Sequence, residues 1–244
     1  MSWFFEHEEE GIILEDDTLP APTFFRFCQE LLERYRDDQR IWVIMGNNLM
    51  SDYPSEEDGS YYFSAHGYGA PWGWASWRRT WNKYDVNIES WPKLRNSPRL
   101  HDFFLTRQER REMLSTFDGV HAGHINSWSY QLDMTRVMGH GLNILPNTDL
   151  VRNIGFGGDA THTVSLKDPR NKDSVQDIGF PLVHPQFLMV DKRRDAEYYR
   201  LYIGDSPMKR FKAKVKWVLG GDSAAVVRLV LRLKNGSARS TTVA

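Results

Sequence analysis

The sequence is poor in cysteine, which excludes a disulfide-stapled fold. With Cys28 as its single cysteine, the chain cannot form an internal disulfide, and this fits a reducing compartment. No apolar run approaches the roughly 20 residues that a helix needs to span a bilayer. The first residues, MSWFFEHE, lack the basic and apolar regions of a signal peptide. We therefore expect a cytoplasmic protein, or one that is peripheral at the inner face of the membrane.

A large excess of charge of either sign is also lacking. The formal net charge is −1, so nothing global indicates a nucleic-acid partner. Residues 207–244 nevertheless carry nine basic side chains against one acid, which leaves the remainder of the chain at about −9. In a helical tail, Lys209, Lys212 and Lys216 share one face, which could contact an anionic membrane surface. A solvated, partly disordered terminus is the alternative for this basic tail, delimited as residues 201–244.

Two catalytic signatures are missing as well. No Gly-x-Ser-x-Gly elbow surrounds a candidate nucleophile, and Cys28 lies on the apolar face of an expected helix, so a covalent enzyme intermediate has no support. The stretch GFGG at 155–158 lacks the third glycine and the preceding strand of a dinucleotide fingerprint, which excludes a Rossmann site. A glycine-rich turn with Thr161, His162 and Thr163 could still bind phosphate oxygens through N–H and hydroxyl donors. A plain surface loop explains the same residues equally well.

What the sequence does contain is an alternation of strand and helix patterns. Apolar residues recur at helical spacing between residues 24 and 36, and short apolar runs of the strand type stand before and after this segment. Such alternation predicts an α/β fold, with a mixed central sheet flanked by helices. We expect the end of a helix over 3–10, which Gly11 breaks, further helices over 24–36, 98–116 and 127–139, strands over 12–14, 41–45 and 142–145, and a Gly-Pro-Trp turn at 68–79 that leads into a basic helix.

Three adjacent carboxylates, Glu15, Asp16 and Asp17, follow the apolar run Ile12-Ile13-Leu14. If that run is a buried strand, the acids lie at its carboxyl end, where open α/β sheets place their ligand sites. Mg²⁺ and Mn²⁺ prefer oxygen ligands and commonly take one or two carboxylates together with substrate phosphates. A divalent cation site is therefore one explanation, and a solvated acidic cluster that caps the next helix is the other.

Tryptophan is abundant, and its placement is uneven. Of nine tryptophans, five fall between residues 72 and 91. Aromatic faces at this density suit the C–H bonds of sugar rings, and they suit a protein core as well. The density alone leaves both roles open.

Longer motifs add a resemblance to a known family. The segment GIILEDDTLPAPTFFRFCQELLERY resembles the metal-binding region of type A (GT-A) glycosyltransferases, and its LEDD…P.FF.F form is similar to N-acetylglucosaminyltransferase I. The segments GWASWRRTWNKYD, ILPNTDLVRNIGFGGDATHT and LVHP resemble a bacterial group of nucleotide-diphospho-sugar transferases, also called hemolytic-protein-like. The resemblance covers about residues 3–190. It implies a GT-A catalytic domain over residues 1–200.

The resemblance implies a role for each acid of the triplet. Asp17 would be the direct ligand of Mn²⁺ or Mg²⁺, while Glu15 and Asp16 would contact the donor sugar and its ribose. The donor would be a nucleoside-diphosphate sugar, and the acceptor a glycan or a lipid-linked saccharide.

The same resemblance implies two further parts of the substrate site. Gly73 and Trp74 would shape the sugar pocket, with Trp72 and Trp77 lining or supporting it. The glycine-rich segment would close over the pyrophosphate through Gly157, Thr161 and His162.

At the expected catalytic base, the chain departs from the family. Where the family carries a Trp-Asp-Tyr-Gln stretch, this sequence has Trp128-Ser129-Tyr130-Gln131. The base is then Asp133, Asp159 or absent. We select Asp133, because it lies one turn from Ser129 if this segment is helical.

A second departure is the short region before the acids. In the family a nucleotide-binding part precedes the acidic motif, whereas 14 residues precede Glu15 here. The resemblance therefore implies an N-terminally truncated member, with weak or absent activity and poor solubility of this chain alone. The expected function is metal-dependent, inverting sugar transfer. A non-catalytic remnant or carbohydrate-binding module, and a nucleotidyltransferase, are the alternatives.

Overall fold

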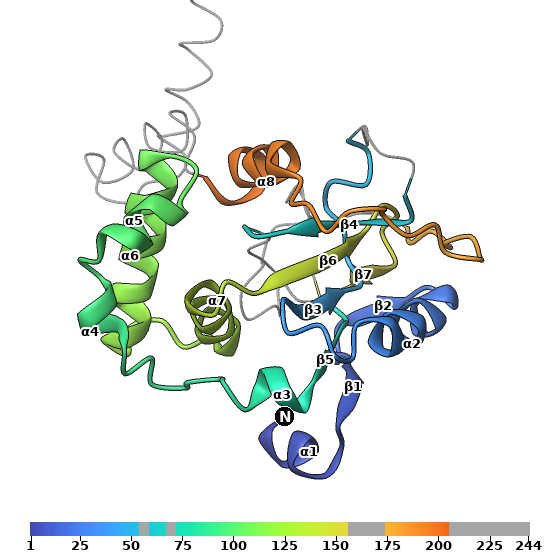
Figure 1. Cartoon of the computed structure of the whole chain (residues 1–244), viewed down its shortest axis with the longest axis horizontal. Coiled ribbons are helices and arrows are strands. Elements are labelled where there is room, and N and C mark those ends of the chain that lie inside the picture. Colours follow the sequence, from blue (N-terminus) through green and yellow to red (C-terminus); the bar gives the residue numbers. More distant parts are fainter. Residues whose placement is uncertain (54–58, 67–71, 156–173, 205–244) are drawn as a thin grey trace, which may run out of the picture. The chain divides into compact units, whose positions relative to one another are not determined.

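The computed structural model of the chain describes residues 1–53, 59–66, 72–155 and 174–204 (Figure 1). The chain divides into two compact units, Met1–Ile203 and Gly204–Ala244. Apart from Gly204, the second unit lies outside the described residues, and so does most of the basic tail that the sequence predicts.

The first unit is built on a five-stranded mixed sheet with the strand order β1-β5-β3-β6-β4. Strands β3 and β6 pair in parallel, and the other neighbours pair antiparallel. Strands β2 and β7 form a separate antiparallel ribbon. The strands are β1 Glu10–Ile13, β2 Thr18–Pro20, β3 Ile41–Met45, β4 Tyr61–Ser64, β5 Trp74–Trp77, β6 Leu142–Pro146 and β7 Val151–Asn153.

The pairing makes β1, β3 and β6 run in the same direction, so their carboxyl ends lie at the same end of the sheet. Trp74 lies at this end, because it is the register partner of both Ile13 and Met45. The acidic triplet follows β1 and therefore lies at this end of the sheet.

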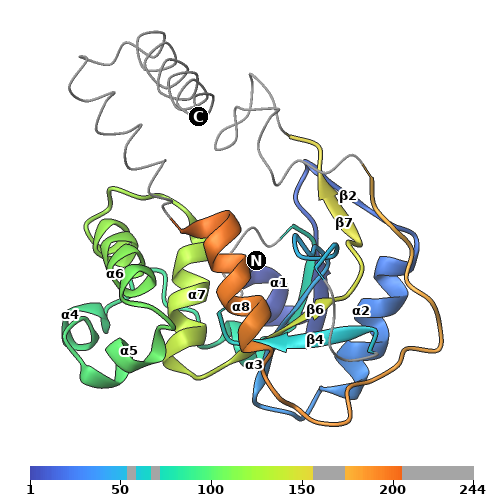
Figure 2. The ribbon, with the colours of Figure 1, turned by 90° about the horizontal axis from the view of Figure 1, so that it is seen from above.

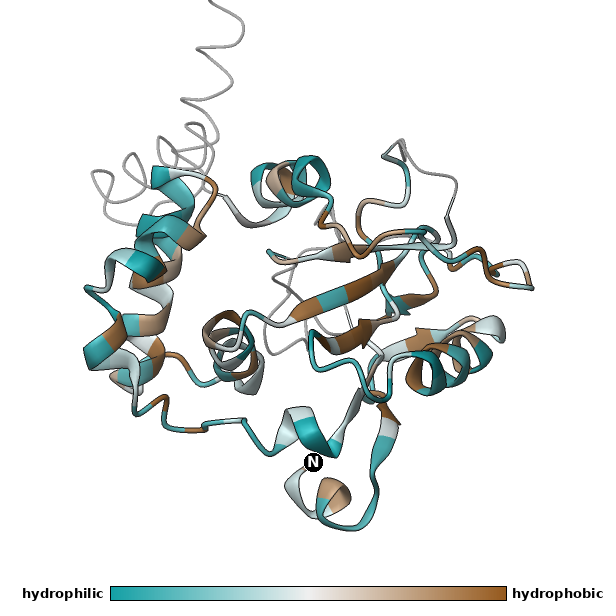
Figure 3. Ribbon diagram, in the orientation of Figure 1, coloured by the Kyte–Doolittle hydropathy of each residue, from teal (hydrophilic) through white to brown (hydrophobic). Residues whose placement is uncertain are grey.

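Helices cover both faces of the sheet, as Figure 2 shows for α2 and α7. The side chains of β3 are divided between the two faces. Ile41 and Ile44 pack in the cluster that contains the apolar face of α2, whereas Trp42, Val43 and Met45 pack in a second cluster with Leu132 of α7. The division departs from strict alternation because the register with β6 shifts between Ile41 and Val43. Figure 3 shows the strands as the most hydrophobic part between these helices. The helices are α1 Ser2–His7, α2 Thr23–Arg34, α3 Arg78–Trp81, α4 Trp91–Leu94, α5 Pro98–Phe103, α6 Arg107–His121, α7 Trp128–Met138, α8 Lys192–Tyr198 and the π-helical turn η1 Tyr199–Ile203.

Helices α4 to α6 build a lobe with its own apolar core, which includes Trp91 and Phe117 and extends to α7. Helix α6 begins with a capping box. Thr106 accepts a hydrogen bond from the N–H of Glu109, and the Glu109 carboxylate accepts one from the N–H of Thr106. Within the described residues, no helix is long and apolar enough to cross a membrane.

The structure confirms the α/β class and most of the expected elements. Helix α2, strand β3, helix α7 and strand β6 lie where the sequence predicts them. The expected helix at 98–116 is instead two helices, because Phe104 has an extended backbone and α6 restarts at its own cap.

Three further sequence expectations are wrong. The helix expected over 3–10 ends at His7, and Glu10 and Gly11 belong to strand β1. The described end of the 68–79 segment is strand β5 and only then helix α3, whereas the sequence predicts a turn that leads directly into a helix. The run 12–14 belongs to β1, but β1 is only partly buried because it is the last strand of the sheet, and Leu14 is 38% exposed.

Candidate functional site

The three acids lie in the turn that joins β1 to β2. Thr18 fixes this turn, because its N–H and hydroxyl both donate to the carbonyl oxygen of Glu15, at 3.2 and 2.7 Å. Asp16 is exposed, while Glu15 and Asp17 are partly buried. The turn thus gives the three carboxylates different surroundings.

Asp17 is held by the ribbon strand β7. Its Oδ2 accepts a 2.8 Å hydrogen bond from Nδ2 of Asn153, and its backbone carbonyl accepts one of 2.7 Å from the N–H of Ile154. The other carboxylate oxygen, Oδ1, is buried and has no hydrogen-bond partner in the described part of the chain. A buried carboxylate oxygen without a donor is costly, and a bound cation or water would relieve it.

The glycine-rich segment begins against the same carboxylate. The N–H of Gly155 donates to Oδ1 of Asn153 at 2.7 Å, and a Cβ on Gly155 would come within 2.6 Å of Oδ2 of Asp17. A side chain at this position would therefore displace the carboxylate. The structure joins the acidic turn to the start of the glycine-rich segment, while Gly157, Thr161 and His162 lie outside the described residues.

Gly73 lies beside the acidic turn. Its φ of +62° is the left-handed conformation that favours glycine, and its carbonyl accepts a 2.7 Å hydrogen bond from the N–H of Gly46. A Cβ here would meet Val151 Cγ2 at 2.8 Å and Leu14 Cδ2 at 3.1 Å. Gly73 thereby allows β5, β7 and the residue before Glu15 to approach closely.

The neighbouring tryptophans belong to the core. Trp74 is 0% exposed and stacks on Trp128 of α7, with ring centroids 5.6 Å apart. Trp72 and Trp77 are also buried, and Nε1 of Trp77 donates to the carbonyl of Leu32 at 3.3 Å. Trp72 and Trp77 pack in the cluster that contains α2, and Trp74 packs in the cluster that contains Leu132 of α7, so in this conformation the three rings do not offer open faces to a sugar.

Asp133 lies on α7, and the helix places it one turn from Ser129, as the sequence predicts. Its side chain is 14% exposed and pairs with Arg136, whose Nη2 is 3.5 Å from Oδ1 of Asp133. Burial raises the pKa of Asp133 to about 6, and the Arg136 guanidinium opposes this rise. A carboxylate with a pKa near neutrality has the proton affinity that a general base needs.

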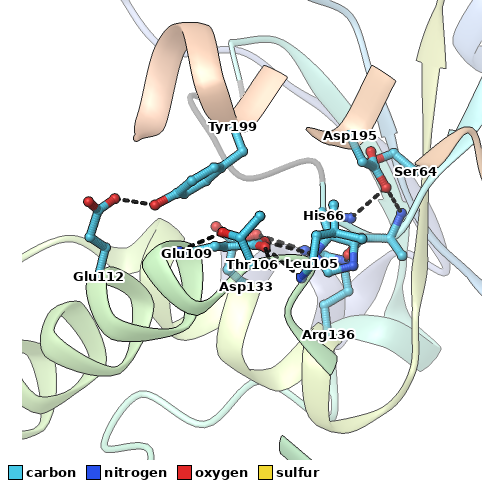
Figure 4. Close-up of polar contacts among 11 residues, drawn as sticks. Ser64, His66, Leu105, Thr106, Glu109, Glu112, Asp133, Arg136, Asp195 and Tyr199 are labelled. Atoms are coloured by element: carbon cyan, nitrogen blue, oxygen red, sulfur yellow. Dashed lines mark hydrogen bonds and ion pairs between the residues drawn. The ribbon is translucent and has the colours of Figure 1, made fainter. Parts of the chain in front are cut away.

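A group of buried polar side chains surrounds this ion pair and was missed by sequence reasoning (Figure 4). Asp195 of α8 accepts hydrogen bonds from the hydroxyl of Ser64 and from the N–H groups of Ala65 and His66. The ring of His66 lies 2.9 Å, Nδ1 to Oε1, from Glu109. Only the Thr-x-x-Glu spacing of the α6 cap is a local signal for this group.

The metal expectation has a limited structural basis. In the residues described, no three His, Cys, Asp or Glu side chains gather as a metal-binding group. Among the buried carboxylates of the described residues, Asp17 offers an oxygen without a hydrogen-bond partner, and its other oxygen is oriented by an amide, as ligating carboxylates commonly are. This fits a cation that takes one protein carboxylate and completes its shell with diphosphate oxygens and water.

Comparison of the sequence with protein-family models finds no match, and comparison with curated proteins finds none either.

Proposed function

We propose that this chain is a metal-dependent glycosyltransferase that moves a sugar from a nucleoside-diphosphate donor to a glycan or lipid-linked acceptor, with inversion. The main support is the contact between Asp17 and the start of the glycine-rich segment. A buried carboxylate oxygen without a hydrogen-bond partner lies there beside Gly155, at which a Cβ would collide with the same carboxylate. This is the combination that a diphosphate and its cation require.

In this proposal Asp17 holds Mn²⁺ or Mg²⁺, and Asn153 keeps the carboxylate in one orientation. The bound cation would neutralise the negative charge that develops on the departing nucleoside diphosphate. Glu15 and Asp16 would contact the sugar and ribose. Gly73 allows the backbone beside them to pack closely.

Asp133 is the proposed base. The acceptor hydroxyl attacks the anomeric carbon, the bond from that carbon to the diphosphate oxygen breaks, and the hydroxyl proton passes to the Asp133 carboxylate. The nucleoside diphosphate leaves with the bonding electron pair. Attack from the face opposite the leaving group inverts the anomeric configuration.

A non-catalytic sugar-nucleotide binder is the second candidate, and one observation favours it. Asp133 already neutralises a buried arginine, and Ser129 stands where the resembling family carries a carboxylate. Binding without turnover would follow if neither residue accepts the acceptor proton.

Calorimetry tests the proposal. UDP- and GDP-linked sugars are titrated into the protein with and without Mn²⁺, using wild type, Asp17→Ala and the matched control Asp37→Ala. Asp37 is exposed in the loop that precedes β3. We expect metal-dependent donor binding in wild type and Asp37→Ala and its loss in Asp17→Ala.

Metal-independent binding of free glycans, unaffected by Asp17→Ala, would refute the transferase proposal. Where donor binding is metal-dependent, NMR of the product distinguishes the two candidates. A new glycosidic bond of inverted configuration indicates transfer, and its absence with every acceptor tried indicates a binder.

A further inference from the structure

We infer that Arg136 is a positioning residue that fixes Asp133 and ties it to the segment Ser64–His66. The inference rests on the proposed function only where it treats Asp133 as the base. The contact itself is a property of the fold, and it can be tested without any substrate.

Arg136 is a buried guanidinium with three defined contacts. It is 1% exposed, and its Nη1 donates to the carbonyl oxygens of Ala65 at 2.6 Å and Gly141 at 3.2 Å. Its Nη2 faces Oδ1 of Asp133 at 3.5 Å. Because a buried positive charge needs a counter-charge, the Asp133 carboxylate supplies one to Arg136. A lysine carries a single ammonium group in place of the planar guanidinium, so it cannot make all three of these contacts at once.

The far anchor of Arg136 is itself rigidly held. The N–H of Ala65 donates to Asp195 at 3.0 Å, the N–H of His66 donates to the same carboxylate at 3.1 Å, and the His66 ring pairs with Glu109. Figure 4 shows Arg136 reaching from α7 toward this segment. Helices α6, α7 and α8 therefore all contact the residues that follow β4. Because Arg136 bonds to this fixed segment and pairs with Asp133, it fixes the position of the Asp133 carboxylate as well.

The titratable side chains drawn with Asp133 in Figure 4 come from three elements. Arg136 lies on the same helix, Glu109 projects from α6, and His66 follows β4. Of these, Arg136 is the group that favours the ionised form of Asp133, against the effect of burial. Without it, Asp133 would hold its proton to a higher pH and would accept none from a substrate near neutrality.

The test follows the Asp133 carboxyl directly. Its titration is read from the ¹³C NMR carboxyl signal, assigned by comparison with Asp133→Asn, in wild type, Arg136→Met, Arg136→Gln and Arg136→Lys. Arg95→Met is the control, because it breaks another Arg–Asp pair, with Asp118 in the α4–α6 lobe. We expect the midpoint to rise by about one pH unit or more in the Met and Gln variants. It should rise less in Arg136→Lys and not at all in Arg95→Met.

The kinetic readout uses donor and acceptor with Mn²⁺. In Arg136→Met and Arg136→Gln, the apparent pKa of the acidic limb of the kcat–pH profile should shift to higher pH by the same amount as the carboxyl midpoint. The KM for the donor should stay unchanged. Arg136→Lys should recover part of kcat at pH 7. A merely structural arginine would change the amount of folded protein and leave the midpoint and the profile of the folded fraction in place.

The outcomes separate the two hypotheses. An unchanged carboxyl midpoint in folded Arg136→Met or Arg136→Gln overturns the positioning role of Arg136. A raised midpoint with an unmoved kcat profile refutes Asp133 as the base. A raised midpoint in a protein that binds no donor supports the coupling of Arg136 to Asp133 and refutes the proposed function.

Discussion

Asn153 donates a 2.8 Å hydrogen bond to Asp17 across 136 positions of the sequence. The same side chain accepts, through Oδ1, from the N–H of Gly155. One amide thus joins the acidic turn to the start of the glycine-rich segment. Any ligand that moves Asp17 must therefore act on that segment, and any change at residue 155 must act on Asp17.

The substitution Gly155→Ala should weaken metal binding without unfolding the protein. The new Cβ would lie 2.6 Å from Oδ2 and 2.8 Å from Cβ of Asp17, so the carboxylate must shift. Loss of an orienting contact at a ligand commonly lowers metal affinity by about 10-fold or more. Mn²⁺ titration followed by electron paramagnetic resonance measures the affinity. Gly179→Ala is the control, because a Cβ there meets no atom within 4 Å, and equal affinities in the two variants would contradict the prediction.

Gly73→Ala should destabilise the fold more than Gly123→Ala does. Both glycines have positive φ, +62° and +73°, so both substitutions carry the left-handed penalty of about 1–2 kcal/mol. A Cβ on Gly73 also meets Val151 at 2.8 Å, whereas nothing lies within 4 Å at Gly123. Overpacking adds about 1–3 kcal/mol at Gly73. Urea unfolding of the two variants isolates this difference, and equal losses would show that the contact with Val151 relaxes freely.

Local patterns predict the elements whose burial is one-sided or continuous. In α2, Phe24, Phe27 and Leu31 recur at helical spacing because one face packs on the sheet. Strand β3 has five consecutive buried residues, and the apolar run in the sequence has the same bounds as the strand, Ile41–Met45. These signals depend only on near neighbours in sequence.

Strand β5 shows why other elements could not be predicted. Its four residues, Trp74 to Trp77, are all buried because β1 and β3 flank it and helices cover both faces. A short run with no alternation fits a strand or a helix start equally well. The basic residues that follow it, Arg78 and Arg79, belong to α3 and favoured the helical interpretation.

The candidate site likewise contains features that the sequence predicts and features that it does not. The acids and the glycine-rich segment were singled out from the sequence, and their joining by Asn153 was not, because an isolated asparagine has no pattern. The buried polar group around Asp133 depends on contacts such as that of Ser64 with Asp195, 131 residues apart. Only tertiary structure supplies such partners.

Asp133 should make the stability of the protein fall as the pH rises from about 4 to 7. Its pKa is raised to about 6 in the folded state, against about 3.9 for an unfolded aspartate, so the folded state binds the extra proton in this range. The stabilising contribution is complete well below the unfolded pKa of about 3.9 and is lost as the pH rises through 6. A difference of one between two pKa values corresponds to about 1.36 kcal/mol, so this contribution amounts to about 3 kcal/mol.

The measurement is the free energy of unfolding in urea at pH 4 and pH 7, for wild type and Asp133→Asn. Groups other than Asp133 titrate in both proteins, so the wild-type value minus that of the variant should fall by about 2 kcal/mol between the two pH values, because at pH 4 the unfolded aspartate is already about half protonated. A difference that is independent of pH would mean that Asp133 titrates normally in the folded protein.

Asp195 should be among the most costly residues to truncate. Its carboxylate accepts from the hydroxyl of Ser64 and the N–H groups of Ala65 and His66, and Asp195→Ala leaves these donors buried without partners. At about 1–3 kcal/mol for each unsatisfied group, the expected loss in unfolding free energy is about 3 kcal/mol or more.

Asp195→Asn should lose less stability. Its carbonyl oxygen still accepts hydrogen bonds, and because burial raises the pKa of Asp195, a neutral side chain avoids part of the desolvation penalty. Glu197→Ala on the same helix is the control, since its pair with Arg200 is at the surface, where solvent screens it and little stability is expected from it. Equal losses for Asp195→Ala and Glu197→Ala in urea unfolding would mean that α8 does not hold the end of β4.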